Sequence, residues 1–382
     1  MNSEGDDNRR GLAAPYPGAE SYSSNIRHLG ALDDLRAVAA LMVVFAHILH
    51  NLTRGIDPSS GDWLRPSNPI FAVLAEGHAG VSLFMVLSGF LFGYGAAGRD
   101  VRYGAFIRNR LLRIFPMYLL VLALGAYSFP EKFSFIALLS SVTLFGNTSA
   151  GLDGGPFTIL LWTISVEFTF YLLFPFLNTF SQRYGRFYLP GLLALFIGLR
   201  ILCVALGASP RNLSYFTIVG RMDQFLIGMI AAHIFIAGHF TIKRTGVALV
   251  GAAFLLMASL YGFNRLGGWV IDARWKVIWH TYEALIFAAL ILAYLAAYPG
   301  LNGVYRRVMG AIGAISYSIY LLHMPILMAF QKRHLYSKLV GVPQYDALVT
   351  GLYIIPIVLG ASWITYTLIE RPFLSLRVKY LS

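Results

Sequence analysis

Apolar segments long enough to cross a lipid bilayer recur along the whole chain and constrain its fold more than any other feature. Ten of them lie at about residues 32–51, 80–98, 113–128, 160–179, 186–206, 215–237, 244–262, 280–298, 308–331 and 346–369. A hydrophobic content of 57%, with 13% charged residues and a mean hydropathy of +0.64, is too apolar for a water-soluble domain. Uninterrupted apolar runs of this length are typical of helices, which satisfy their own backbone hydrogen bonds in lipid. The sequence therefore predicts an all-α, polytopic transmembrane helix bundle with about ten spans.

The polar ends of the chain delimit one membrane domain. Residues 1–30 lack the basic-then-apolar pattern of a cleaved signal peptide and are expected to form a disordered cytoplasmic tail. Residues 31–373 form the transmembrane domain, and residues 374–382 are a C-terminal tail too short for a second domain. The apolar stretch 133–146 is too short for a crossing, which favours a re-entrant or interfacial helix.

Loop charges predict the orientation of the chain. Lys and Arg are more frequent on the side that holds the N-terminus, above all between Arg99 and Arg113. By the positive-inside rule, both termini are cytoplasmic, in a multi-pass protein of the cell (inner) membrane. The net charge of +12 is therefore explained by topology rather than by nucleic-acid binding. Cys203 is the single cysteine, so we expect no disulfide framework, no cysteine metal site and no redox chemistry.

The first span carries an arginine near its start and a histidine eleven residues later. At about 100° per residue, Arg36 and His47 lie on one helix face, roughly 16 Å apart along the axis. Ionisable groups within a span are costly in hydrocarbon and are functional candidates by default. The alternative is an interfacial arginine and a histidine that hydrogen-bonds a neighbouring helix.

Further polar residues interrupt the later spans. Ser88-Gly89 lies in the middle of the second span, where small residues are typical of close helix packing. The third span begins with a cluster of guanidiniums, which either set topology or bind phosphates. The remaining candidates are Arg108, Arg110 and Arg113 of that cluster, Glu167 in the fourth span, Arg221 and Asp223 in the sixth, and His323 before Pro325 in the ninth. Arg221 and Asp223 also fit a structural role, as partners that neutralise buried charges.

These motifs, taken in order, resemble the acyltransferase 3 family of integral membrane enzymes. The resemblance covers about residues 30 to 373 and rests on Arg36 with His47, Phe84 to Phe90, Arg108 to Pro116, Trp162 to Tyr171, Arg221 to Gly228, Ser316 to Pro325 and Glu370 to Phe373. Two positions depart from the family pattern: Thr163 replaces a frequent serine, and Ser82 replaces a frequent aspartate. The resemblance implies an enzyme that transfers acyl groups, commonly acetyl from acetyl-CoA, to sugars and other hydroxylated acceptors.

Counting residues from the span ends places the candidate side chains at similar depths. His47, Ser88, Glu167, Arg221 and His323 each lie roughly 6 to 12 Å from the outer edge of the hydrocarbon, at 1.5 Å per residue. The sequence therefore predicts one polar layer within the bundle.

We interpret this layer as the site of an acyl-CoA-dependent O-acyltransferase. Its acceptor is a hydroxyl of a saccharide, a lipid-linked glycan or a small natural product, and no bound cofactor or metal is expected. His47 is the best general base, because its unperturbed pKa lies near neutrality, and Glu167 would orient or assist it. Arg36, Arg108, Arg110 and Arg113 would bind the phosphates of the donor, while Ser88, Arg221, Asp223 and His323 would bind the acceptor or relay a proton. The alternative is a proton-coupled secondary transporter built on the same buried charges.

Overall fold

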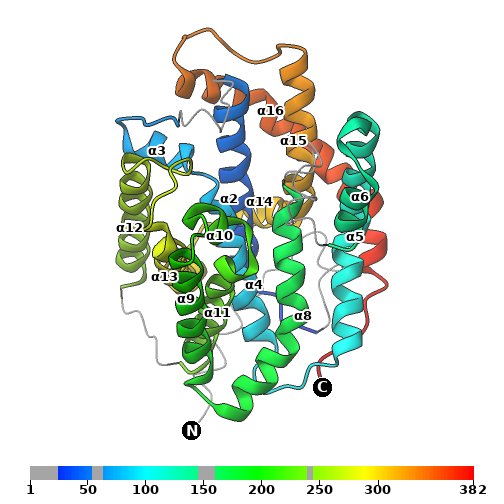
Figure 1. Ribbon diagram of the computed structural model, residues 1–382, viewed down its shortest axis with the longest axis vertical. Coiled ribbons are helices and arrows are strands. Elements are labelled where there is room, and N and C mark those ends of the chain that lie inside the picture. The colour runs from blue at the N-terminus through cyan, green and yellow to red at the C-terminus, as the bar shows by residue number, and fades with distance from the viewer. Residues whose placement is uncertain (1–24, 54–62, 145–159, 239–243) are drawn as a thin grey trace.

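The computed structural model describes residues 25–53, 63–144, 160–238 and 244–382, and in these ranges the chain is helical, with one isolated bridge between Val101 and Leu381 (Figure 1). The α-helices are α2 (Gly30–His47), α3 (Pro69–Ala75), α4 (Ala79–Gly95), α5 (Tyr103–Ser128), α6 (Phe135–Val142), α8 (Leu161–Tyr184), α9 (Tyr188–Ala205), α10 (Pro210–Phe216), α11 (Ile218–Ile236), α12 (Thr245–Arg265), α13 (Lys276–Ala297), α14 (Gly303–Ala314), α15 (Ser316–Lys332), α16 (Pro343–Thr365) and α17 (Arg371–Leu374). Shorter 3-10 turns are η4 (Pro130–Lys132) and η5 (Tyr298–Gly300), and π-helical turns are η2 (Ile48–Thr53) and η6 (Tyr366–Glu370). The prediction of an all-α multi-pass membrane protein is confirmed.

Within the described part, eight helices are long and apolar enough to cross a membrane, or up to ten if each of two bent helix pairs is one span. The pairs are α3 with α4, bent by 70°, and α14 with α15, bent by 65°. The predicted span 308–331 therefore contains a break that its apolar pattern does not predict. The break lies where α14 packs against the start of α2, because a Cβ added to Gly313 would lie 2.0 Å from the Asp33 carbonyl oxygen.

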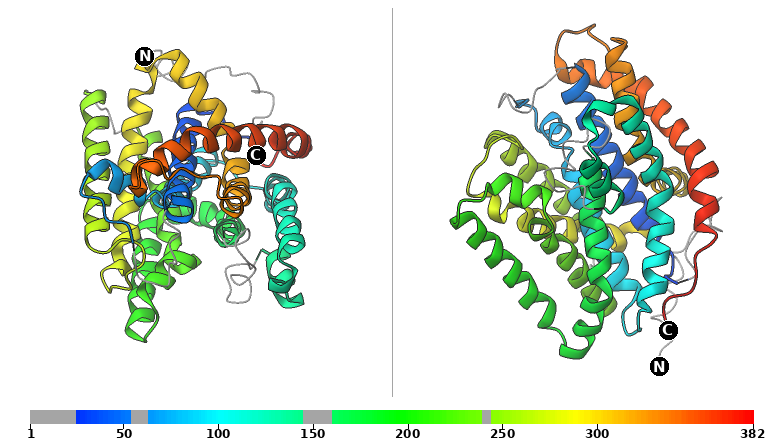
Figure 2. Two further views of the ribbon diagram at one scale, coloured as in Figure 1. Left: turned by 90° about the horizontal axis from the view of Figure 1, so that it is seen from above. Right: turned by 45° about the vertical axis from the view of Figure 1, so that its right-hand side comes forward.

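The bundle has a buried centre and a lipid-facing periphery. Helices α2, α8, α11 and α13 are mostly buried, whereas α9 and α12 expose most of their apolar side chains. Figure 2 shows α16 running obliquely along the outside of the bundle, away from α9 and α12. The polar side chains of the central helices are therefore shielded from lipid, as intramembrane charges require.

The backbones of helices α4 and α11 are in direct contact at two glycines. A Cβ on Gly89 would lie 2.1 Å from the Phe225 carbonyl oxygen, and one on Gly228 would lie 2.2 Å from that of Val86. Small residues allow this approach, as predicted for Ser88-Gly89. Because Gly89 is turned toward α11, its neighbour Ser88 faces another side of α4.

Both described ends of the chain lie on one face of the bundle. The Asn25 side chain donates a hydrogen bond to the Val378 carbonyl (3.0 Å), and Ser382 N donates to the Asp100 carbonyl (3.2 Å). Asn178 near the end of α8 donates to the Arg99 carbonyl (3.0 Å), so α8 ends on the face from which α5 starts. The end of α5 and the start of α8 therefore lie on the opposite face.

Helix α6 belongs to this connection and has eight residues, a length of about 12 Å. It is too short to cross a bilayer, as expected of an interfacial or re-entrant helix.

Candidate functional site

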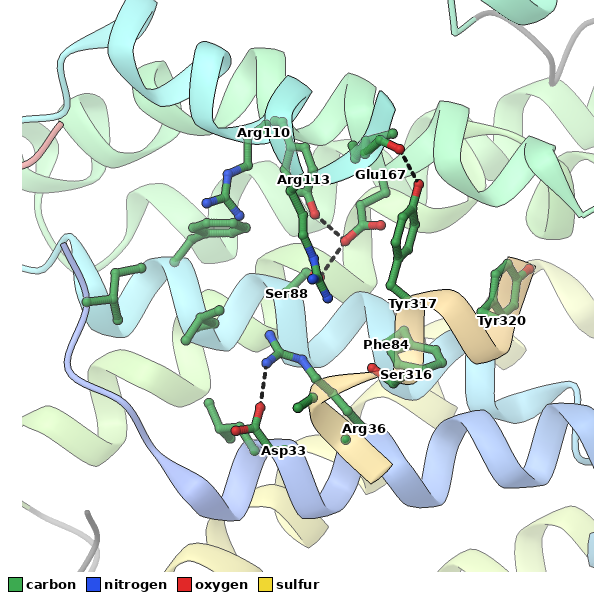
Figure 3. A pocket seen from close by; sticks show the side chains of 18 of the residues that line it. Asp33, Arg36, Phe84, Ser88, Arg110, Arg113, Glu167, Ser316, Tyr317 and Tyr320 are labelled. Carbon is green, nitrogen blue, oxygen red and sulfur yellow. Dashed lines mark hydrogen bonds and ion pairs between the residues drawn. The ribbon is translucent and has the colours of Figure 1, made fainter. Parts of the chain in front are cut away.

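A cavity of about 220 Å³ lies within the bundle (Figure 3). Its lining includes Ile26 and Arg377, so it reaches the face that holds the neighbouring residues Asn25 and Val378. Its walls come from α2, α4, α5, α8, the junction of α14 and α15, and the final segment of the chain. Five arginines line it, namely Arg27, Arg36, Arg110, Arg113 and Arg377, against two carboxylates, Asp33 and Glu167. The excess of positive charge makes the cavity suited to an anion.

Arg36 extends into the cavity from α2 and is fixed by Asp33. Its Nη1 lies 3.0 Å from Oδ1 of Asp33, and His28 contacts the other carboxylate oxygen. Asp33 is almost fully buried, whereas Arg36 is partly exposed to the cavity. The three-residue spacing places both groups on one helix face and could have revealed this pair from the sequence.

Arg113 reaches the same region from α5, and Figure 3 shows its guanidinium directed toward that of Arg36. Its Nη1 lies 2.8 Å from Oε2 of Glu370, which is buried in η6 and also accepts a hydrogen bond from Ser318. The guanidinium stacks on the Tyr317 ring at 5.4 Å. Arg113 therefore has one paired edge and remains partly exposed to the cavity.

Arg110 lies one turn earlier on the same face of α5. It is only 8% exposed, and its guanidinium stacks on the rings of Phe92 (5.0 Å), Phe106 (5.5 Å) and Tyr171 (5.7 Å). In the part of the chain that the structure describes, no carboxylate forms an ion pair with it, and its Nε has no hydrogen-bond partner. A buried guanidinium without a counter-ion is costly unless an anion binds beside it.

Arg108 differs from the other arginines of the predicted cluster. Its side chain is exposed, reaches the Leu376 carbonyl at 3.4 Å and does not line the cavity. It lies two positions before Arg110, and this spacing turns it to a different face of α5. The structure therefore places Arg36, Arg110 and Arg113 together and leaves Arg108 outside.

Glu167 lies in the middle of the cavity wall. Ser88 donates a hydrogen bond to its Oε1 (2.9 Å), and Tyr171, one turn later on α8, donates to the same oxygen. No hydrogen bond joins Glu167 to His47 in the described ranges. The expected contact between these two residues is thus absent, and His323 takes its place.

The deep end of the cavity is formed by Phe84, Thr163 and Tyr320. The hydroxyls of Thr163 and Tyr320 are hydrogen-bonded at 3.0 Å, and the ring of Phe84 contacts that of Tyr320 edge to face. On α2 the lining stops at Arg36, and on α15 it stops at Tyr320. His47 and His323 lie further along these two helices.

His47 and His323 form a pair beyond this end. Nδ1 of His47 lies 2.8 Å from the Val43 carbonyl oxygen and 3.4 Å from Nε2 of His323, with ring centroids 5.1 Å apart. His323 is fully buried and His47 partly exposed. With Nδ1–H donating to Val43, Nε2 of His47 is left as a proton acceptor. His47 also ends α2 where the π-helical turn η2 begins, a feature frequent at functional sites.

Arg221 and Asp223 lie elsewhere, in a buried network between α4, α9, α11 and α13. Arg221 donates to Ser82 (2.9 Å), which in turn donates to Glu283, so Glu283 supplies a carboxylate near the position where Ser82 replaces an aspartate. Asp223 pairs with Arg200 at 2.8 Å, both fully buried. Neither Arg221 nor Asp223 lines the cavity. The predicted polar layer therefore divides into the cavity wall, the histidine pair and this network.

Comparison with known proteins places the whole arrangement in one family. A family model described as an acyltransferase domain matches residues 29–367. O-acetyltransferase OatA of Staphylococcus aureus is 25% identical over 388 residues, which cover 91% of this chain and 57% of that protein. Exopolysaccharide production protein ExoZ of Rhizobium meliloti is 28% identical over 78% of this chain and 90% of its own length.

Nodulation protein 10 of Rhizobium leguminosarum bv. viciae is 26% identical, over 78% of this chain and 83% of its own length. The chain spans little more than half the length of the OatA proteins that it matches. No solved structure matches it significantly. The match to nearly all of the membrane domain shows that this chain belongs to the acyltransferase 3 family.

Proposed function

We propose that the protein transfers an acetyl group from acetyl-CoA to a hydroxyl of a saccharide, a lipid-linked glycan or a small natural product. The observation that carries this proposal is the buried guanidinium of Arg110, which has no counter-ion among the described residues and lies in a cavity rich in arginine. Phosphate groups suit such a site, because guanidinium forks bind them through charge-assisted hydrogen bonds. The names of two relatives, an O-acetyltransferase and an exopolysaccharide production protein, support an acetyl group and a saccharide.

The arrangement of the side chains assigns a path to the donor. Its phosphates lie among Arg36, Arg110 and Arg113, and its flexible arm extends along the wall formed by Ser88 and Glu167. The Glu167 carboxylate accepts hydrogen bonds and can take one from an amide N–H of that arm. The thioester then meets the acceptor at the histidine pair, beyond Tyr320.

His47 acts as the general base of the proposed reaction. Nε2 takes the proton of the acceptor hydroxyl while the oxygen attacks the thioester carbonyl, the C–S bond breaks, and the leaving thiolate receives the proton from His47. His323 orients the His47 ring through Nδ1 and faces the imidazolium that forms. The base, His47, is thus oriented by a second side chain, His323, on the neighbouring helix α15, as general bases of this kind usually are.

Activity of the purified protein tests this function. In detergent, with no membrane gradient, it should release CoA from acetyl-CoA when extracts containing hydroxylated acceptors are added. A proton-coupled transporter would consume no thioester under these conditions. Mass spectrometry of glycans and lipids from cells with and without the gene should then identify the molecule that loses its acetyl group.

Arg113→Lys should raise the KM for acetyl-CoA by about tenfold, since a charge-assisted hydrogen bond contributes about 1.5–3 kcal/mol. Lysine keeps the charge but cannot pair with Glu370 and a phosphate through a planar fork. The acceptor KM should hardly change, because the acceptor meets His47 on the other side of Tyr320. Steady-state kinetics with both substrates varied measures the two KM values.

Arg108→Lys is the matched control for this experiment. It makes the same exchange on the same helix but outside the cavity, and the donor KM should remain within about twofold of the wild-type value. Donor KM values unchanged in both Arg113→Lys and Arg110→Lys would remove these residues from the donor site and leave them a topological role.

We also propose that the face carrying Asn25 and Val378 is cytoplasmic. In a Cys203→Ser background, cysteines at the exposed positions Asp100 and Ser382 should be protected from a membrane-impermeant thiol reagent in whole cells. A cysteine at Ser67, which is exposed before α3 on the opposite face, should react. Labelling of the first two positions with protection of the third would reverse the orientation.

A further inference from the structure

The final segment of the chain, residues 375–382, is fastened across the entrance of the cavity. The Asn109 side chain pairs with both backbone groups of Val378, donating to its carbonyl (2.7 Å) and accepting from its N–H (2.9 Å). Asn25 accepts from Tyr380 N (2.6 Å), and Arg102 N donates to the Tyr380 carbonyl (2.9 Å). Because these bonds reach the backbone, they fix the path of the segment whatever its side chains are.

Two side chains of this segment belong to the cavity lining, Arg377 and Tyr380. Tyr380 is 1% exposed, contacts the Phe106 ring edge to face at 5.2 Å, and its hydroxyl has no hydrogen-bond partner in the described ranges. Phe106 is also one of the rings on which Arg110 stacks. Among the described residues, this hydroxyl has no partner and the guanidinium of Arg110 beside it has no counter-ion, which indicates that a polar, anionic ligand binds here.

The charges at the cavity entrance also favour a bound anion. Burial, together with the nearby positive charges of Arg113 and Arg110, lowers the pKa of Arg377 to about 10, so the guanidinium is still protonated at neutral pH. Of the two lining carboxylates, Asp33 pairs with Arg36 and His28, and Glu167 accepts from Ser88 and Tyr171, and none of these contacts involves Arg110 or Arg377. A bound anion would relieve the mutual repulsion of these arginines.

We infer that the final segment completes a phosphate site at the cavity entrance, in which Arg377 and Tyr380 join Arg110 in binding a phosphate of the donor's nucleotide end. This inference rests on the proposed use of acyl-CoA. The thioester must reach inward past Ser88, so the nucleotide stays at the entrance, beside the final segment. Asn25 and Asn109 are positioning residues, because they touch the segment and not the ligand.

Calorimetry with the purified full-length protein in detergent tests the site without relying on turnover. Arg377→Ala should weaken binding of CoA by about tenfold or more and leave binding of unphosphorylated pantetheine unchanged. The same comparison with 3′-dephospho-CoA locates the phosphate that Arg377 binds. If Arg377→Ala weakens binding of this ligand as much as it weakens binding of CoA, Arg377 binds the diphosphate. If Arg377→Ala does not weaken binding of this ligand, Arg377 binds the ribose phosphate. Arg377→Lys should recover part of the affinity.

Lys379→Ala is the matched control, because it removes the same charge two residues further along, from an exposed side chain. It should leave the affinity for CoA unchanged. Asn109→Ala should raise the donor KM with little change in kcat, and adding Arg377→Ala to it should weaken binding less than Arg377→Ala does alone. This non-additivity is expected only if Asn109 acts by placing Arg377.

The outcomes separate this inference from the proposed function. If the wild-type protein does not bind CoA, the proposed donor is wrong. If CoA binds and Arg110→Ala weakens it while Arg377→Ala and Arg377→Gln do not, the donor site stands and the role of the final segment is refuted. Arg377→Gln keeps the length and polarity of the side chain, so it remains informative if the alanine variant does not fold.

Discussion

Replacing His47 with alanine should lower kcat by about 10²- to 10⁴-fold, the usual contribution of a general base. The physical reason is the position of the ring: Nδ1 is held by the Val43 carbonyl at 2.8 Å, which leaves Nε2 to accept a proton. The ring is partly exposed and adds little to packing, so the variant should fold and elute from a sizing column as the wild type does. Initial rates with saturating donor measure the effect.

The His323 side chain provides a second variant for the same prediction. His323→Ala should reduce kcat less than His47→Ala, because it removes an orienting contact at 3.4 Å and leaves the base in place. The exposed His334, in the loop after α15, is the matched control, and His334→Ala should not change kcat. Near-normal turnover in His47→Ala, with the donor KM unchanged, would remove His47 from the chemistry.

Asp223→Ala should lower the free energy of unfolding by about 3–5 kcal/mol, the usual cost of breaking a buried ion pair. Asp223 and Arg200 are both fully buried and lie 2.8 Å apart, and Arg200 also donates to the Gly220 carbonyl (2.9 Å) and to Thr281. Without the carboxylate, Arg200 would remain charged in the bundle. Thermal unfolding in detergent measures the loss.

A double variant separates the contribution of the Arg200–Asp223 pair to the free energy of unfolding from the cost of leaving one buried charge without a partner. Arg200→Met with Asp223→Leu removes both charges, and it should recover most of the stability that Asp223→Ala loses. Arg186→Met, at an exposed arginine before α9, should change the stability by less than about 0.5 kcal/mol. A fully stable Asp223→Asn protein with no transfer activity would instead support the proton-relay role that the sequence suggested.

Local patterns predicted the parts of this site that lie within one helix. The apolar spans and the shared face of Arg36 and His47 follow from residue spacing. The same arithmetic would have joined Asp33 to Arg36. It also gave similar depths for residues that the fold distributes over three separate groups, because depth says nothing of which helices are neighbours.

Contacts between distant segments could not be read from one sequence. Arg113 and Glu370 are separated by 257 residues, and His47 and His323 by 276. The order in which the helices pack decides these pairs, and residue spacing within one helix carries no information on that order. Residues 374–382 have no periodic pattern that would predict their place at the cavity entrance. Charge alone groups Arg108 with Arg110 and Arg113, although it lies on a different face of α5.

The side chains at the deep end of the cavity have a consequence for the proposed reaction. The proposed transferase would take its donor from one side of the membrane and its acceptor from the other. An open passage between the two sides would let ions leak down their gradients across the membrane. The hydrogen-bonded Thr163 and Tyr320, with Phe84 against them, form a septum between the arginines and the histidines. Under the proposed function, only a slender arm carrying an uncharged acyl group would need to displace it. The bilayer would thus stay insulated through each turnover, while a chemical group, and no free ion, changes sides.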